Sequence, residues 1–249
     1  MADPSVRDCE KNEVDWWSHW ADVRWFGTNA WLIESDLFQE YFMNRGGFLQ
    51  CDHAEEDFAR METFFARRGL APIFFVQDGC TETIRRMNAE GYRAVDGMSV
   101  MTPDHISIVT NKDLRVEVAS EAGLDDWSRV YLESFYGELR LKDAVVSITK
   151  SLGIGTHESV LLLGRIEGNP AGVLALHRTP GLLGVYCVGT LPQFRGRAVA
   201  ATLIDAALGT GREEGRHVVL QTIVSDGYES YYRERGFKRL YSKTLLKKG

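Results

Sequence analysis

Three apolar runs separated by short turns lie in the second half of the chain and constrain its fold more than any other feature. They cover residues 159–166, 170–177 and 184–190, with the turns Glu167-Gly168-Asn169 and Pro180-Gly181 between them. Apolar runs joined by short, Gly-containing turns are typical of neighbouring antiparallel strands. The sequence therefore predicts a three-stranded antiparallel meander.

Helical and strand-like segments alternate on both sides of this meander. Further strands are predicted at residues 71–76, 92–101, 114–119, 218–224 and 239–246. Helices are predicted at residues 52–68, 81–89, 124–135, 145–152, 198–211 and 228–234. This order predicts an α/β (α+β) fold in which a mixed, mostly antiparallel twisted sheet is flanked by helices.

The N-terminal half is expected to be a helical domain that carries part of the same fold. Residues 12–31 place aromatic side chains at helical spacing and predict an amphipathic helix followed by an apolar run. Arg45-Gly46-Gly47 is expected to be a turn. The polar segment 103–113 is the best linker, which gives domains at residues 1–110 and 111–249.

Charge and cysteine spacing exclude several classes of function. A net charge of −6 argues against a partner with a phosphate backbone, such as nucleic acid. No window is long and apolar enough for a membrane span, and the first residues lack the apolar core of a signal peptide. The four cysteines are widely spaced, which argues against a zinc site or a disulfide framework. We therefore expect a reduced, cytoplasmic protein without a bound metal.

A compact basic loop follows the last strand of the meander. Residues 186–208 read YCVGTLPQFRGRAVAATLIDAAL, an apolar strand, a Pro, an Arg-Gly-Arg turn and then an amphipathic helix. The first N–H groups of a helix lack intrahelical partners and sit at its positive end, so small residues there expose an anion site. An exposed turn with two solvated arginines explains the same charge pattern.

This stretch resembles the GNAT superfamily of N-acetyltransferases. The family signature [Q/R]-x-x-G-x-[G/A] follows a strand and a Pro, and here it reads from Arg195 to Ala200, with Ala198 where the family usually has Gly. A second segment, SDGYESYYRERGFKRL, resembles the family pattern N-x-x-A-x-x-x-Y-x-x-x-G-F, with Ser225 in place of the Asn. The resemblance covers about residues 114–249. Residues 87–101 faintly repeat residues 232–246, which suggests that the N-terminal half is a degenerate copy of the same unit.

The resemblance implies a binding site for acetyl-CoA and a catalytic tyrosine. The coenzyme pyrophosphate would meet the turn and helix start, and the acyl carbonyl would meet the strand before it, where Gly189 is expected to ease a bulge. Tyr232 corresponds to the family's general acid, with Tyr231 as the fallback. The implied coenzyme contacts are Val188, Gly189, Thr190, Arg195, Gly196, Arg197, Ala198, Val199, Ala200, Ser225 and Tyr231.

The implied function is acetyl-CoA-dependent N-acetyltransfer to a primary amine of a small molecule, amino acid or peptide, by direct attack in a ternary complex. A non-catalytic acyl-CoA or metabolite sensor with a drifted site is the main alternative, and an aminoacyl-tRNA-dependent transferase is a third. No general base is marked among His177, Glu133 and Asp143. A nucleophilic role for Cys187 is not expected, because no His lies near it in the sequence to activate it.

Two features bear on the acceptor and on assembly. Asp125, Asp126 and Glu133 are acidic residues that would attract a cationic amine, although a solvated helix face explains them equally well. Five of the six tryptophans lie within the first 31 residues. They are expected to pack as a core or to form a homodimer surface, and a wall of the amine pocket is a third interpretation.

Overall fold

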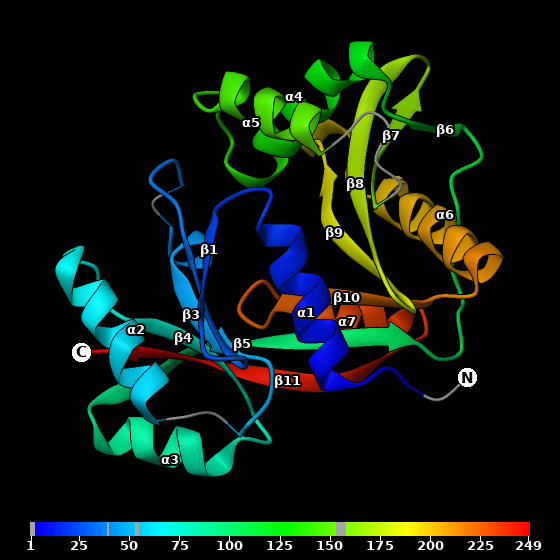
Figure 1. Ribbon diagram of the computed structural model, residues 1–249. Coiled ribbons are helices and arrows are strands. Elements are labelled where there is room, and N and C mark those ends of the chain that lie inside the picture. The colour runs from blue at the N-terminus through cyan, green and yellow to red at the C-terminus, as the bar shows by residue number, and fades with distance from the viewer. Residues whose placement is uncertain (1–2, 39, 53–54, 153–157) are drawn as a thin grey trace. The chain divides into compact units, whose positions relative to one another are not determined.

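Strands and helices alternate along the chain in the computed structural model, which describes residues 3–38, 40–52, 55–152 and 158–249 (Figure 1). The α-helices are α1 (Val6–Trp17), α2 (Glu55–Arg67), α3 (Thr81–Ala89), α4 (Leu124–Phe135), α5 (Lys142–Ser151), α6 (Val199–Glu214) and α7 (Tyr228–Glu234). The strands are β1 (Asp22–Phe26), β2 (Ala30–Glu34), β3 (Arg45–Phe48), β4 (Ile73–Gln77), β5 (Tyr92–Pro103), β6 (Leu114–Val118), β7 (Ser159–Ile166), β8 (Asn169–Thr179), β9 (Leu182–Thr190), β10 (His217–Ile223) and β11 (Phe237–Lys248). Short 3-10 helices are η1 (Tyr41–Met43), η2 (Glu121–Gly123) and η3 (Pro192–Phe194).

The chain divides into two compact units. The first contains residues 1–102 and 221–249, and the second contains residues 103–220. These units are compact bodies in space. The boundary near residue 110 that the sequence suggests separates two functional domains, and it stays a prediction. The α/β class with a mostly antiparallel sheet is confirmed.

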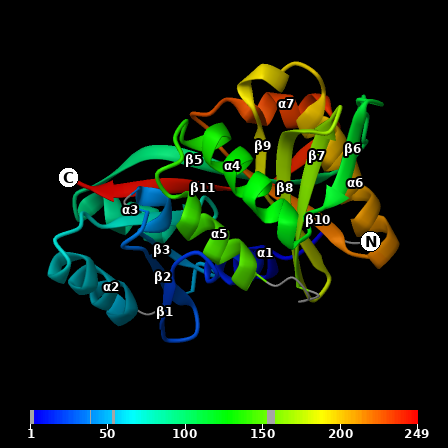
Figure 2. The ribbon, with the colours of Figure 1, turned by 90° about the horizontal axis from the view of Figure 1, so that it is seen from above.

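The second unit contains the expected meander. Strands β7, β8 and β9 pair antiparallel in sequence order, and β6 adds antiparallel to β7. The start of β10 pairs parallel with β9, from His217 opposite Leu182 to Leu220 opposite Val185. Helices α4 and α6 cover opposite faces of these strands (Figures 1 and 2). The three-strand prediction is therefore confirmed, with β8 and β9 slightly longer than expected.

The first unit has strands in the order β1-β2-β3-β4-β11-β5. Strand β11 (red in Figure 1) lies between β4 and β5 and pairs antiparallel with β4 from Lys243 to Lys247. The two faintly similar segments, 87–101 and 232–246, both fold as the end of a helix followed by a strand, α3–β5 and α7–β11. Their common origin stays a prediction.

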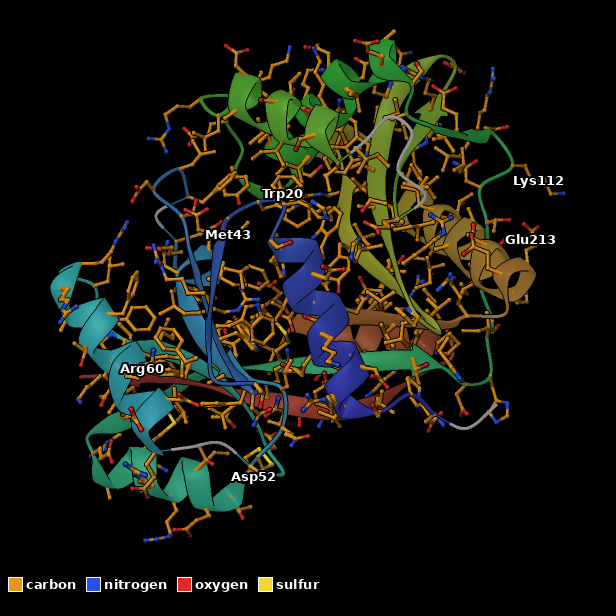
Figure 3. All side chains as sticks on the ribbon, viewed as in Figure 1. Trp20, Met43, Asp52, Arg60, Lys112 and Glu213 are labelled. Carbon is orange, nitrogen blue, oxygen red and sulfur yellow. A yellow bond between two sulfur atoms is a disulfide. The ribbon has the colours of Figure 1, made fainter. Side chains whose placement is uncertain are left out.

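The tryptophan-rich N-terminus forms less helix than the sequence suggests. Helix α1 ends at Trp17, and the residues expected to continue it form the β1–β2 hairpin instead. The helix expected within residues 12–31 thus ends earlier than its aromatic spacing suggests, and Gly27, at φ +61°, lets the chain reverse so that the following residues pair. Among the five tryptophans, Trp25 alone is largely exposed, at 48%, while Trp20, three residues beyond α1 and labelled in Figure 3, is buried. Most of the cluster is therefore core.

A buried charge network holds α1 in the first unit. The Arg45 guanidinium lies 2.6 Å from Glu13 Oε1, with both side chains fully buried, and 4.2 Å from the centre of the Phe42 ring. Lys243 of β11 lies 2.7 Å from Glu10 Oε1 and also pairs with Glu13. Each buried charge thus has a partner, as burial of charge requires.

The segment Arg45-Gly46-Gly47 is strand β3 and does not form the expected turn. A Cβ atom on Gly46 would lie 2.5 Å from the Phe74 ring, and one on Gly47 would lie 2.3 Å from the Trp31 ring. The glycines are therefore there because neighbouring aromatic rings occupy the space of a side chain.

The cysteines also correct an expectation. Cys51 and Cys80 form a disulfide across 29 residues, so the expectation of a reduced protein without a disulfide framework is wrong for this pair. The two cysteines are far apart in the sequence, and the approach of β3 and β4 in the sheet brings the residues after them together.

Within the described residues, no group of three His, Cys, Asp or Glu side chains is placed to hold a metal ion. None of the helices in the same part of the chain has the length and apolarity to cross a membrane.

Candidate active site

The turn between β9 and α6 is built from left-handed backbone. After η3 the chain passes through Gly196 at φ +76° and Ala198 at φ +54°, and α6 begins at Val199. Left-handed backbone is easy for Gly and costs a residue with a Cβ about 1 kcal/mol or more. Ala198, which stands where the family usually has Gly, therefore adopts this left-handed conformation at the expense of local strain.

The start of α6 has the properties of an anion site. No side chain of the described residues caps this end of the helix, so its first N–H groups remain available. Arg195 and Arg197 are exposed, and neither guanidinium is paired with a carboxylate in the described part of the chain. Ala198 and Ala200 are half-buried and small. Positive charge and free N–H groups together favour a phosphate.

Two contacts fix the helix start in the second unit. Gly172 of β8 lets α6 lie against the sheet, because a Cβ there would lie 2.5 Å from Val199 Cγ1. The Asn111 backbone N–H donates to Thr202 Oγ1 (2.8 Å), and that hydroxyl donates to the Ala198 carbonyl (2.9 Å). Asn111 precedes Lys112, which Figure 3 labels on the extended segment beside α6. This segment thus supports the turn as well as linking elements.

Strand β9 is bulged just before this turn. Opposite Leu174 of β8 the strand has two residues, Cys187 and Val188, and Cys187 has φ +53°. The indole N–H of Trp127 in α4 donates to the Leu174 carbonyl (3.4 Å). The expected bulge therefore exists, but its left-handed residue is Cys187 and not Gly189. The register of β9 with β10 ends at Val185, so residues 186–190 extend beyond it.

A comparison with protein families decides what this arrangement belongs to. The model described as "Acetyltransferase (GNAT) family" matches residues 123–241, which include the bulged strand, the turn and α7. Residues 123–241 form a GNAT acetyltransferase domain. The resemblance of the sequence to this superfamily is therefore confirmed. No curated protein sequence matches the chain.

Solved structures show the same fold over nearly the whole chain. The "GCN5-related N-acetyltransferase from Kribbella flavida" has a TM-score of 0.72 at 14% identity, covering 99% of this chain and 96% of that one. A second "GCN5-related N-Acetyltransferase", from Sphaerobacter thermophilus, has a TM-score of 0.64 at 18% identity, covering 96% and 85%. A "functionally unknown conserved protein" from Staphylococcus epidermidis has a TM-score of 0.61 at 13% identity, covering 92% and 94%. These likenesses concern the fold.

The expected acid of the GNAT domain, Tyr232, lies on α7 in the first unit. Its side chain is buried, with the Tyr231 ring 5.3 Å and the Phe237 ring 5.9 Å from its own, centre to centre. Burial raises the pKa of Tyr232 above its ordinary value, so the phenol keeps its proton at neutral pH. The Arg235 guanidinium covers the Tyr231 ring at 3.4 Å.

Ser225, expected to contact coenzyme, has a local partner in the first unit. Its hydroxyl donates to Asp96 Oδ2 (2.5 Å), and its N–H donates to Asp96 Oδ1 (3.2 Å). The same Oδ1 accepts from the Gly97 N–H (2.7 Å). Asp96 thereby fixes the turn between β10 and α7.

The candidate bases lie in the second unit, in surroundings that do not favour the role. His177 is fully buried, 2.8 Å from Ser159 Oγ, and stands opposite Gly184 in the register. Gly189 stands opposite Val173, which lies four positions from His177 along β8, about 13 Å in an extended strand. Glu133 pairs with Arg129 (3.2 Å).

The other acidic candidates are either paired or exposed. Asp125 pairs with Lys142 (2.8 Å) and Asp126 pairs with Arg165 (2.9 Å), so their charge is already balanced locally. Asp143 is exposed in the first turn of α5. These pairings weaken the expectation that this acidic face attracts a cationic amine.

Sequence reasoning missed three residues that shape the site: Asn111, Trp127 and Asp96. Each acts through a hydrogen bond to a backbone or side-chain group far away in the sequence. A single polar residue in a presumed linker, helix or strand gives no sequence signal for such a bond.

Proposed function

We propose that the protein is an acetyl-CoA-dependent N-acetyltransferase that acts on a primary amine of a small molecule, amino acid or peptide. The observation that carries this proposal is the uncapped start of α6, with two exposed arginines, directly after the bulged strand β9. GNAT acetyltransferases generally use acetyl-CoA, and the turn 195–200 fits its pyrophosphate. Arg195 and Arg197 would contact the phosphate oxygens, together with the N–H groups of Ala198, Val199 and Ala200.

The proposed chemistry is a direct transfer in a ternary complex. The amine nitrogen attacks the thioester carbonyl carbon, a C–N bond forms, and the C–S bond breaks. The backbone N–H groups of Val188 and Thr190 would hold the carbonyl oxygen as it gains charge. Tyr232 would give its proton to the departing thiolate, and the extra proton on the amine would leave to water.

The state of Cys187 supports direct transfer over a covalent relay. The thiolate is the nucleophilic form of cysteine, and burial raises the pKa of the Cys187 thiol. At neutral pH this residue is therefore a thiol held within the bulge.

Coenzyme binding is tested by calorimetry with acetyl-CoA. Arg195→Glu is expected to weaken binding by about tenfold to a hundredfold, since it removes a charge-assisted contact and adds repulsion. Arg212→Glu is the matched control, because Arg212 lies in the last turn of the same helix. Equal affinities for the wild type and Arg195→Glu would reject the proposed phosphate site.

The role of Tyr232 is tested by Tyr232→Phe. Loss of a general acid is expected to lower kcat by about a hundredfold or more, with little change in acetyl-CoA affinity. Tyr228→Phe on the same helix is the control, because Tyr228 is 56% exposed. Unchanged turnover in Tyr232→Phe would show that Tyr232 packs in the core and is not the general acid.

Turnover also separates the enzyme from a sensor with a drifted site. Ala198 departs from the usual Gly, yet its backbone is left-handed as a Gly there would be. This shape supports a working turn. Binding of acetyl-CoA without transfer to any of a broad panel of amines would favour the sensor.

Assembly and location belong to the same proposal. Sedimentation would test the homodimer, for which Trp25 is the exposed member of the tryptophan cluster. The cytoplasmic location stays a prediction, and the Cys51–Cys80 disulfide weighs against it because disulfides are rare in reducing compartments.

A further inference from the structure

Ser134, near the end of α4, packs directly on the strand that precedes the phosphate turn. A Cβ atom placed on Gly189 of β9 would lie 3.0 Å from Ser134 Cβ and 3.1 Å from Ser134 Oγ. A side chain at position 189 would require Ser134 or its helix to shift by a few tenths of an ångström. Because Gly189 has no side chain, α4 packs closely on β9, and the Ser134 hydroxyl lies beside this part of the strand.

The Ser134 hydroxyl is buried and has no hydrogen-bond partner among the described residues. A serine in a helix can donate its hydroxyl back to a carbonyl one turn earlier. Other helix hydroxyls of this protein do so, as Ser151 donates to the Ile148 carbonyl (2.7 Å) and Thr210 to the Ala206 carbonyl (3.2 Å). A buried hydroxyl left without such a bond is unfavourable, unless a ligand completes it.

The neighbours of Ser134 indicate which group of a bound ligand would accept the missing hydrogen bond from its hydroxyl. Ser134 faces Gly189, which lies beyond the β9–β10 register and directly follows the bulge at Cys187 and Val188. Thr190 pairs with Gly172, and a Cβ on Gly172 would point at Val199 of α6. Because successive residues of a strand face opposite sides, Gly189 and Ser134 lie on the side away from α6. Ser134 is thus placed for the acyl end of a thioester and not for its phosphates.

We propose that the Ser134 hydroxyl donates a hydrogen bond to the acyl carbonyl oxygen of the bound thioester. During transfer the amine nitrogen bonds to the carbonyl carbon, and the electron pair of the C=O bond moves onto this oxygen. Ser134 stabilises that charge until the pair returns, the C–S bond breaks and the thiolate takes a proton from the acid. This inference rests on the proposed acetyl-CoA-dependent function and adds a side-chain donor to the backbone donors of β9.

The experiment compares acetyl-CoA with free CoA, which lacks the acyl carbonyl. Calorimetry on the full chain is expected to show that Ser134→Ala weakens acetyl-CoA about threefold to tenfold and leaves CoA unchanged. Infrared spectra of bound acetyl-CoA carrying ¹³C at the carbonyl are expected to show a weaker hydrogen bond in Ser134→Ala. Its melting temperature should not fall, because the removed hydroxyl has no protein partner.

Ser128→Ala is the matched control on the same helix. The Ser128 hydroxyl is buried and lies 3.5 Å from Thr149 Oγ1, so its loss should affect stability and not the ratio of the two affinities. Equal losses for acetyl-CoA and CoA in Ser134→Ala, or no loss and an unshifted carbonyl band, would overturn the inference while the proposed function stands. Failure of the wild type to bind either compound would overturn both.

Discussion

The side-chain amide of Asn111 donates a hydrogen bond to the backbone carbonyl of Arg197 (Nδ2–O, 2.9 Å), in the middle of the turn between β9 and α6. The side-chain oxygen Oδ1 of Asn111 accepts a hydrogen bond from the Asp113 backbone N–H (2.8 Å), which orients the side-chain amide. Because the backbone of Asn111 also reaches Thr202, one residue holds both the turn and the first helical turn after it. Asn111 is therefore a positioning residue for the proposed coenzyme site.

Asn111→Ala is expected to weaken acetyl-CoA binding by about twofold to tenfold with kcat unchanged, since one hydrogen bond that orders the turn is lost. Calorimetry and steady-state kinetics give the two quantities separately. Asn169→Ala is the control, because that amide bonds the Glu167 carbonyl (3.3 Å) in the hairpin between β7 and β8. An Asn111→Ala protein with wild-type affinity would show that the turn keeps its shape without this bond.

The sequence predicted the meander, the position of the turn before α6 and α7 closely, because each depends on local signals. Alternating apolar residues, Gly-containing turns and the Arg195–Ala200 motif act over a few residues. The β1–β2 hairpin, the strand at Gly46 and the disulfide could not be predicted in this way. They depend on rings and strands that only the folded sheet brings together, as the close approach of Phe74 to Gly46 illustrates.

Ala198→Gly is expected to raise stability by about 1 kcal/mol, or the melting temperature by about 2–4 °C, because Gly adopts φ +54° without strain. Ala200→Gly provides the contrast. It lies within α6, where Gly costs about 0.5–1 kcal/mol relative to Ala. Thermal unfolding of both variants checks the opposite signs, and a loss of stability in Ala198→Gly would contradict the strain.

Glu229 should make stability depend on acid pH. Burial alone would raise the pKa of this carboxyl, but hydrogen bonds from Arg239, Ser99 and Arg233 outweigh it and lower the pKa to about 2. A depressed pKa stabilises the fold above the ordinary value of 4.5 and loses that effect as pH falls toward 2. Glu229→Gln is therefore expected to cost about 3 kcal/mol at neutral pH and to flatten this part of the pH profile.

Denaturant unfolding between pH 2 and pH 7 measures this effect. Glu234→Gln on the same helix is the control, because the Glu234 side chain is 76% exposed and its nearest cation is Arg235 at 3.9 Å. The same acid slope in the wild type and Glu229→Gln would show that other carboxyls carry the dependence.

The Cys51–Cys80 disulfide is expected to add about 3–4 kcal/mol, because it closes a loop across 29 residues and so restricts the unfolded chain. Cys51→Ser should lose this amount without reductant. Adding a reductant should bring the wild type down to the variant. Identical unfolding midpoints for the wild type with and without reductant would contradict a stabilising bond.

The place of β11 between β4 and β5 sets the order in which a nascent chain becomes foldable. Residues 1–102 emerge from the ribosome first, yet their sheet lacks an inner strand until residues 237–248 have been made. Until then Glu10 and Glu13 of α1 also lack Lys243, their shared cation. The first unit therefore cannot complete its sheet until the second unit and β11 have been translated. Cutting the gene near residue 110 would therefore leave this sheet without the strand between β4 and β5.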